Sequence, residues 1–307
     1  MTFIKSTSVF TVIAEVTLWL LMSVLTLLLS YNLIGVEPFR RGFFCDDETI
    51  RYPYKDDTVS DTMVAVIFVV VPIIIMIITE TVHIVSIKSR QEKGSKVLVQ
   101  KFSAKFYRTV GAFLFATLCT MFLTETMKLF GGRLRPHFVS LCKPDFSKLN
   151  CSQGYIMIHT GTCTADVTRR KLLDARKSFP SGHASLSAFG AIYLLVYLQL
   201  RFIWTQKIRI LLPLIQVGII CASAFVCISR VNDNKHHFGD VIAGAILGTV
   251  LALLALKYVS CIRRNGKHVS HYLPDTVHDT PTSPVLTNTS PARNGQTPNT
   301  VVEMKDV

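Results

Sequence analysis

The sequence contains few charged residues. They make up 17% of its 307 residues, while hydrophobic residues make up 50%. Soluble domains carry about 25% charged residues, so this composition excludes an ordinary soluble domain and indicates an integral membrane protein. Acidic side chains are the scarcer kind, 20 against 33 basic ones, which leaves a formal net charge of +13. The basic residues flank apolar runs, where they normally set membrane orientation, and we therefore expect no nucleic-acid partner.

Alternating strand patterns and a signal-peptide cleavage site are also missing. The apolar runs are continuous, which excludes a transmembrane β-barrel. The first run is too long for the hydrophobic part of a signal peptide and no small-residue cleavage site follows it, so we expect a retained helix. A helix needs about 20 apolar residues to cross a bilayer. The sequence predicts an all-α polytopic membrane protein with six transmembrane helices, at about 9–30, 62–87, 107–130, 182–200, 210–228 and 238–258.

Basic residues orient these spans. The connector from 88 to 108 holds many Lys and Arg residues against Glu92 as its single acid, so the positive-inside rule places it in the cytoplasm. The short basic turn 201–209 falls on the same side, which makes both termini cytoplasmic. The opposite face then receives three segments, at about 31–61, 131–180 and 229–237.

Composition separates the chain into two parts. Residues 1–258 contain all the apolar spans and are expected to form one membrane domain. Residues 259–307 are rich in Ser, Thr, Pro, Asn and Gly and lack apolar periodicity. Such a segment cannot bury enough apolar surface to fold, so we predict a disordered cytoplasmic tail.

Cysteines and one sequon mark the non-cytoplasmic loops. Disulfides persist on that side of a membrane. We expect them among Cys142, Cys151 and Cys163, with Cys45 also present in these loops, and the sequence leaves the pairing open. The triplet Asn150-Cys151-Ser152 matches an N-glycosylation acceptor on the accessible side. A disulfide at Cys151 would make Asn150 a poorer acceptor.

Three polar clusters meet on that same face. Residues 128–136 close the third span, residues 179–183 open the fourth, and residues 229–240 join the fifth to the sixth. Charge at the edge of a membrane segment is costly and usually functional. Taken one by one the clusters could be ordinary flanking charges, but together they indicate a site.

The cationic residues of these clusters suit a phosphate group. Lys128, Arg135 and Arg230 supply positive charge and planar donor forks for several anionic oxygens. Ser181 and Gly182 lie where a helix begins, so free backbone N–H groups would add to the anion site.

Two histidines provide a mechanism for phosphate transfer. His236 and Asp240 are four residues apart, so on a helix Asp240 would accept the Nδ1–H and leave Nε2 of His236 as the nucleophile. His237 lacks an acid at that spacing and is taken as a bystander. His183 would protonate the leaving oxygen and later activate water. No cofactor or metal is required, because the cations belong to the protein; a metal site of two His and one Asp is the alternative, and cationic neighbours disfavour it.

The clusters resemble the three-part signature of the type 2 phosphatidic acid phosphatases. That signature reads Lys-x6-Arg-Pro, Pro-Ser-Gly-His and Ser-Arg-x5-His-x3-Asp, and every position is filled here. Further segments are similar to the animal lipid phosphate phosphatases, such as residues 41–45, 51–54 and 132–138. The resemblance implies a six-helix membrane enzyme with a core like that of vanadium-dependent haloperoxidases. It assigns His236 as nucleophile, Asp240 as its partner, His183 as acid and base, and the phosphate ligands Lys128, Arg135, Ser181, Gly182 and Arg230.

The resemblance also implies substrates and a location. The substrates would be phosphatidate, lysophosphatidate, sphingosine 1-phosphate and ceramide 1-phosphate, dephosphorylated without metal at the outer or lumenal face. We expect the plasma membrane, although the endoplasmic reticulum and Golgi fit the same orientation, and a homo-oligomer is consistent with the family. Three alternatives remain: a glucose-6-phosphatase-like enzyme, for which nine spans would be expected, a lipid phosphotransferase of the sphingomyelin-synthase kind, and a scaffold that binds lipid phosphates without turnover.

Overall fold

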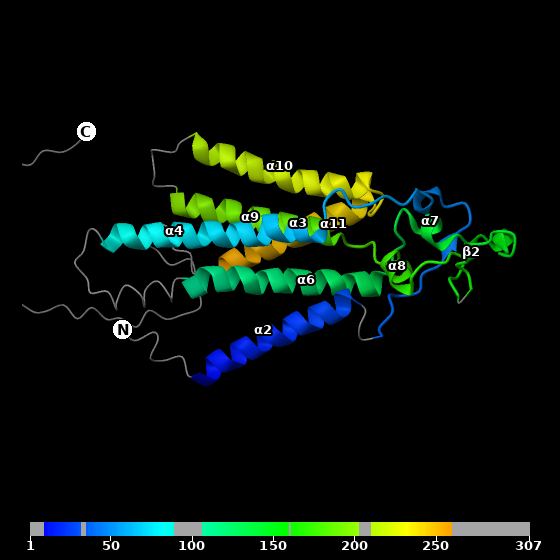
Figure 1. Cartoon of the computed structure of the whole chain (residues 1–307), viewed down its shortest axis with the longest axis horizontal. Coiled ribbons are helices and arrows are strands. Elements are labelled where there is room, and N and C mark those ends of the chain that lie inside the picture. Colours follow the sequence, from blue (N-terminus) through cyan, green and yellow to red (C-terminus); the bar gives the residue numbers. More distant parts are fainter. Residues whose placement is uncertain (1–8, 32–34, 89–105, 160, 203–209, 260–307) are drawn as a thin grey trace, which may run out of the picture. The chain divides into compact units, whose positions relative to one another are not determined.

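The computed structural model describes residues 9–31, 35–88, 106–159, 161–202 and 210–259. In this part of the chain six helical segments are long and apolar enough to cross a membrane, which confirms the all-α, six-span prediction (Figure 1). The predicted tail lies outside the described residues from residue 260 on, as does most of the connector and turn used to orient the spans.

Three of the spans are single helices and three contain a wider turn. The first, fourth and fifth are α2 (Val9–Ser30), α9 (Gly182–Phe202) and α10 (Leu211–Asn232). The second runs through α3 (Asp61–Ala65), the π-helical turn η2 (Val66–Val70) and α4 (Val71–Lys88). The third combines the π-helical turn η3 (Tyr107–Gly111) with α6 (Ala112–Gly131), and the sixth combines α11 (Phe238–Leu254) with the π-helical turn η6 (Ala255–Val259).

Helix α9 forms the centre of the bundle. It packs most extensively against α11 and also contacts α6 and α10, while α2 lies against α6 (Figure 1). Glycines allow the closest of these approaches: a Cβ at Gly248 of α11 would lie 2.1 Å from the Ser185 carbonyl oxygen of α9. Phe113, Phe189 and Tyr193 fill the core between α6 and α9, with the rings of Phe113 and Tyr193 edge to face at 4.9 Å. The outward faces of α2 and α10 expose apolar side chains, as a lipid-facing surface requires.

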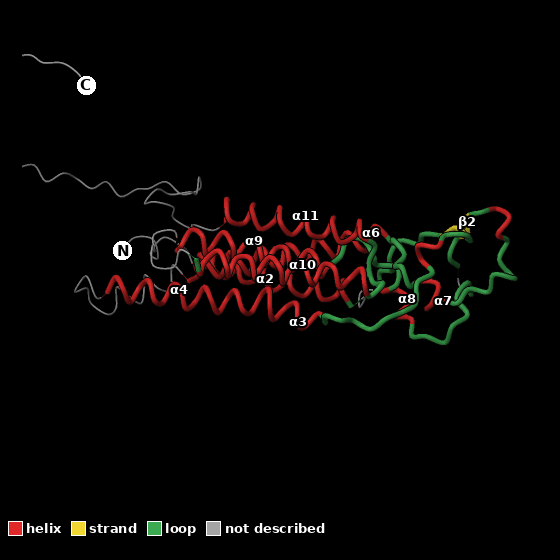
Figure 2. Tube along the Cα trace, turned by 90° about the horizontal axis from the view of Figure 1, so that it is seen from above, coloured by secondary structure: helices red, strands yellow, loops and turns green. Residues whose placement is uncertain are grey.

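The loops at one end of the helices fold into a cap (Figure 2). Its core contains Phe43, Ile50, Leu134 and Phe138. The short elements of the cap are β1 (Phe43–Phe44), η1 (Glu48–Ile50), α7 (Phe138–Cys142), η4 (Cys151–Gln153), β2 (Tyr155–Ile156) and α8 (Arg169–Asp174). Strands β1 and β2 pair antiparallel with Phe43 opposite Ile156, and strands of two residues are too short for alternation to predict them.

Two disulfides hold the cap together. Cys142 pairs with Cys163, both members of the predicted trio. Cys151, the third member, pairs with Cys45 instead. This second bridge joins the loop before α3 to the loop before α9, two segments whose proximity the sequence does not reveal.

Candidate active site

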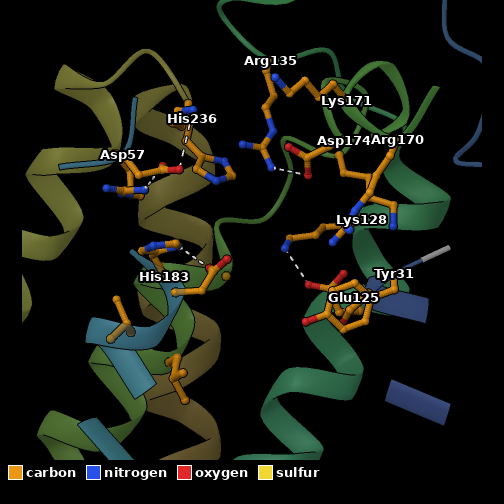
Figure 3. A pocket seen from close by; sticks show the side chains of 18 of the residues that line it. Tyr31, Asp57, Glu125, Lys128, Arg135, Arg170, Lys171, Asp174, His183 and His236 are labelled. Carbon is orange, nitrogen blue, oxygen red and sulfur yellow. Dashed lines mark hydrogen bonds and ion pairs between the residues drawn. The ribbon is translucent and has the colours of Figure 1, made fainter. Parts of the chain in front are cut away.

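A cavity of about 790 Å³ lies where α2, α3, α6 and α9 meet the cap. It brings together six of the eight predicted catalytic and phosphate-binding residues. They are Lys128, Arg135, Gly182, His183, Arg230 and His236. His183 and His236 lie on one side of the cavity, and Lys128 and Arg135 on the other (Figure 3). Ser181 and Asp240 are fully buried behind its wall.

His236 is presented by the loop that connects α10 to α11. Its Nδ1 donates a hydrogen bond to the carbonyl oxygen of Ser178 at 2.6 Å, which leaves the lone pair on Nε2. Burial, with the positive charges of Arg135 and Lys128 as the next causes, lowers the pKa of His236 well below its ordinary value. The imidazole is therefore neutral at physiological pH, as a nucleophile must be.

The predicted hydrogen bond from His236 to Asp240 is wrong. Asp240 Oδ2 lies 4.0 Å from His236 Nδ1, beyond hydrogen-bond distance. Helix α11 begins at Phe238 with His237 as its N-cap, so His236 precedes the helix and the spacing of four does not stack it on Asp240. His237, taken as a bystander, is the histidine that contacts Asp240: its Nδ1 and backbone N lie 3.2 and 3.0 Å from Oδ2.

Asp240 is linked to His236 through Ser178. The Ser178 hydroxyl donates to Asp240 Oδ2 at 2.6 Å, and the carbonyl of the same residue accepts the His236 proton. Arg133 binds the other oxygen, with Nη1 2.6 Å from Oδ1. Arg133 and Ser178 thus contact Asp240 in a way that sequence reasoning missed, although Arg133 lies within the first motif and Ser178 directly precedes the second.

His183 lies in the first turn of α9 and faces the cavity. Its Nε2 donates to the Val59 carbonyl oxygen at 3.0 Å, which leaves Nδ1 as the free basic nitrogen. Nδ1 is 3.5 Å from Asp61 Oδ1. The ring can therefore exchange a proton through Nδ1 while Val59 holds its orientation.

Each of the predicted phosphate-binding cations contacts a carboxylate. Lys128 Nζ lies 2.6 Å from Glu125 Oε1, Arg135 Nη2 lies 2.9 Å from Asp174 Oδ1, and Arg230 Nη1 lies 2.7 Å from Asp57 Oδ1. These pairs orient the cations toward one cavity. Glu125 was within reach of sequence reasoning, because a spacing of three on a helix places it beside Lys128. The same spacing applies to Asp233, whose Oδ2 lies 2.8 Å from Arg230 Nη2.

At the start of α9, the prediction of free backbone N–H groups at Ser181 and Gly182 is wrong for Ser181. Gly182 lines the cavity, and a Cβ there would lie 3.1 Å from Lys128 Nζ, so the glycine leaves room for the lysine. As the first residue of the helix, Gly182 presents one of the N–H groups that a helix leaves unpaired. The N–H of Ser181 is instead used internally, donating to the Asp240 carbonyl oxygen at 3.0 Å.

The cavity changes character with depth. Its membrane end is lined by apolar side chains, namely Leu27, Val64, Ala65, Met121 and Leu186. Its cap end is strongly basic, with Arg170, Lys171, Lys177 and Lys235 in addition to the predicted cations. Burial alone would raise the pKa of Asp174 at this end, but Arg135 and Lys128 lower it below its ordinary value. Within the described ranges, no group of three or more His, Cys, Asp or Glu side chains is arranged to hold a metal ion.

Comparisons with known proteins agree with this geometry. Residues 109–264 match the PAP2 superfamily. The chain is 40% identical to phospholipid phosphatase 1 of Rattus norvegicus, over 73% of this chain and 76% of that protein. It is 34% identical to a putative phosphatidate phosphatase of Drosophila melanogaster, over 84% of this chain and 70% of that protein. It is also 34% identical to phospholipid phosphatase 2 of Mus musculus, over 73% and 77%. No solved structure matches the chain, so the predicted likeness to haloperoxidase cores stays a prediction.

Proposed function

Because the chain belongs to the PAP2 superfamily, we propose that this integral membrane protein hydrolyses lipid phosphate monoesters. One observation carries the proposal: a single cavity holds two histidines, the three predicted phosphate-binding cations and four further basic side chains next to an apolar lining. A phosphate headgroup suits the polar part, and acyl chains suit the apolar part that opens among the transmembrane helices. A soluble sugar phosphate has no acyl chain to occupy that apolar part.

The reaction would proceed in two steps, formation of a phosphohistidine and its hydrolysis. Nε2 of His236 attacks phosphorus, the bond from phosphorus to the lipid oxygen breaks, and His183 gives its proton to the departing alkoxide. Water then attacks the phosphohistidine while His183 takes a proton from it, and the bond from nitrogen to phosphorus breaks. Lys128, Arg135, Arg230 and the Gly182 N–H would stabilise the negative charge on the equatorial oxygens. The cations of the protein supply the charge that a metal would otherwise provide.

The substrates we propose are phosphatidate, lysophosphatidate, sphingosine 1-phosphate and ceramide 1-phosphate. The relatives named as phospholipid and phosphatidate phosphatases support this choice. We further propose that the cavity faces the outside of the plasma membrane or the lumen of an internal one, and that the chain can form a homo-oligomer. Asn150 is exposed on the cap and stays a predicted glycosylation site, although its neighbour Cys151 is in a disulfide.

Phosphate release from lipid substrates tests the proposal directly. Purified protein in detergent micelles should release phosphate from phosphatidate in excess EDTA, and His236→Ala should abolish release because the nucleophile is gone. His159→Ala is the matched control, because His159 is an exposed cap histidine away from the cavity. Loss of activity in EDTA would instead favour the metal site, and no release from any lipid phosphate by folded protein would favour the scaffold.

A further inference from the structure

Glu125 is an acid placed among cations. Its side chain is 7% exposed, and its Oε1 lies 2.6 Å from Lys128 Nζ. The hydrogen bond from Lys128 uses Oε1, and Glu125 lines the cavity. A buried carboxylate needs hydrogen-bond donors, and a ligand in the cavity can supply one to Oε2.

For the phosphate alone, Glu125 is unfavourable. A negative charge this close to Lys128 opposes the binding of a phosphate dianion. The acids paired with the other two cations lie elsewhere. Asp174 sits beside Arg135 near the cap, and Arg230 pairs with Asp57 and Asp233, whereas Glu125 lies below Lys128 toward the membrane (Figure 3). Its position matches a part of the substrate other than the phosphate.

Helix α6 orders three side chains by depth. Met121, Glu125 and Lys128 follow one another along one face, and at about 1.5 Å per residue the Cα atom of Glu125 lies about 4.5 Å closer to the membrane centre than the Cα atom of Lys128. With the phosphate at Lys128 and the chains beside Met121, the intervening carbons of the lipid backbone fall at the level of Glu125. Those are the carbon that bears the phosphoester and the carbon next to it.

We propose that Glu125 determines specificity by accepting a hydrogen bond from the substituent on the carbon next to the phosphoester carbon. This inference rests on the proposed function. Lysophosphatidate carries a free hydroxyl at that carbon and sphingosine 1-phosphate carries an ammonium group, so both donate to the carboxylate. Phosphatidate carries an acyl ester there, which offers only acceptors and is repelled. Glu125 therefore favours lipid phosphates with a donor at this carbon.

Matched variants separate this role from the orientation of Lys128. We would measure kcat/KM for lysophosphatidate, sphingosine 1-phosphate and phosphatidate in mixed micelles at equal surface fractions. Glu125→Gln is neutral and offers an N–H to the ester, so both donor lipids should lose about tenfold relative to phosphatidate. Asp174→Asn also removes a carboxylate from a phosphate-binding cation, but near the cap, and should change all three lipids by one factor.

The outcomes are distinct. Glu125→Asp keeps the charge, and it should alter the substrate ratios less than Glu125→Gln does. An equal change on all three lipids in Glu125→Gln and Glu125→Asp, complete loss included, overturns the inference and leaves Glu125 as a partner of Lys128 only. Failure of the unaltered protein to release phosphate from any of the lipids overturns the proposed function instead.

Discussion

Two buried histidines, His137 and His236, both have a pKa below the ordinary value. His137 donates from Nδ1 to the Asn234 carbonyl oxygen at 2.7 Å, and burial first, opposed by that bond and aided by Arg135, lowers its pKa to about 4. His236 has a lowered pKa mainly through burial as well. Burial first, and the positive charge of Arg135 after it, keep both imidazoles neutral, and a proton on either one would add a positive charge beside Arg135.

Acid should therefore destabilise the fold through His137. The unfolded chain binds a proton near pH 6.5 and the folded one near pH 4, so stability is complete above pH 6.5 and falls as the pH drops toward 4. The loss from this group is about 3 kcal/mol. Thermal midpoints in detergent at pH 7, 5.5 and 4.5 would measure it. His137→Gln keeps a donor that does not titrate, and its midpoint should depend less on pH; an unchanged pH dependence in this variant would contradict the assignment.

At the scale of elements, the contact of α9 with α11 positions His183 relative to Asp240. The first turn of α9 carries His183, and the first turn of α11 carries Asp240. Gly244 and Gly248 bring the two helices together, because a Cβ at Gly244 would lie 2.4 Å from the Ser181 carbonyl oxygen. The distance between the helices therefore sets the distance between His183 and Asp240.

Gly248→Ala should destabilise the protein and reduce its activity. The added Cβ would meet backbone atoms of Ser185 at 2.1 Å, and backbone can yield only if the helices separate. Overpacking of this kind costs about 1–3 kcal/mol. Gly218→Ala is the control, since that position on α10 has no atom within 4 Å of a new Cβ. Melting temperature and phosphate release should fall in the first variant alone; equal behaviour of the two would argue against tight packing of α9 on α11.

At the scale of the whole described molecule, the cap joins distant parts of the chain above the cavity. The Cys45–Cys151 disulfide spans 106 residues. Asp57, from the same loop as Cys45, reaches Arg230 of α10. Residues from the loop before α3 therefore complete a site whose histidines come from the later half of the chain.

Loss of this disulfide should lower stability by about 2–4 kcal/mol. Cys45→Ser and the double variant Cys45→Ser/Cys151→Ser should behave alike, because either one removes the same bond. Cys221→Ser should have no effect, because Cys221 is an exposed free cysteine on α10. Thermal denaturation in detergent would compare them. If Cys45→Ser melted like the unaltered protein, the bridge would contribute nothing to the cap.

Sequence patterns predicted some of this molecule and not the rest, for physical reasons. Hydropathy located the spans because crossing a bilayer requires long apolar helices. Motif spacing located Lys128, His183 and His236, because their chemistry is tied to residue type. The hydrogen bond of Asp240 could not be predicted, since it depends on α11 beginning two residues after His236. Asp57 comes from a loop and Asp174 ends the short helix α8, and both segments are placed by long-range contacts such as the Cys45–Cys151 bridge.

The change from an apolar floor to a basic upper cavity also bears on how the products separate. The substrate has parts that fit both ends of the cavity. Hydrolysis divides it into a lipid that fits the apolar end and a phosphate that fits the basic end. The lipid product has lost its phosphate charge and partitions into the bilayer, beside Leu27 and Met121. Inorganic phosphate is soluble only in water, beyond Arg170 and Lys171. We therefore expect the two products to leave in opposite directions, which reduces their chance of rebinding together in the cavity.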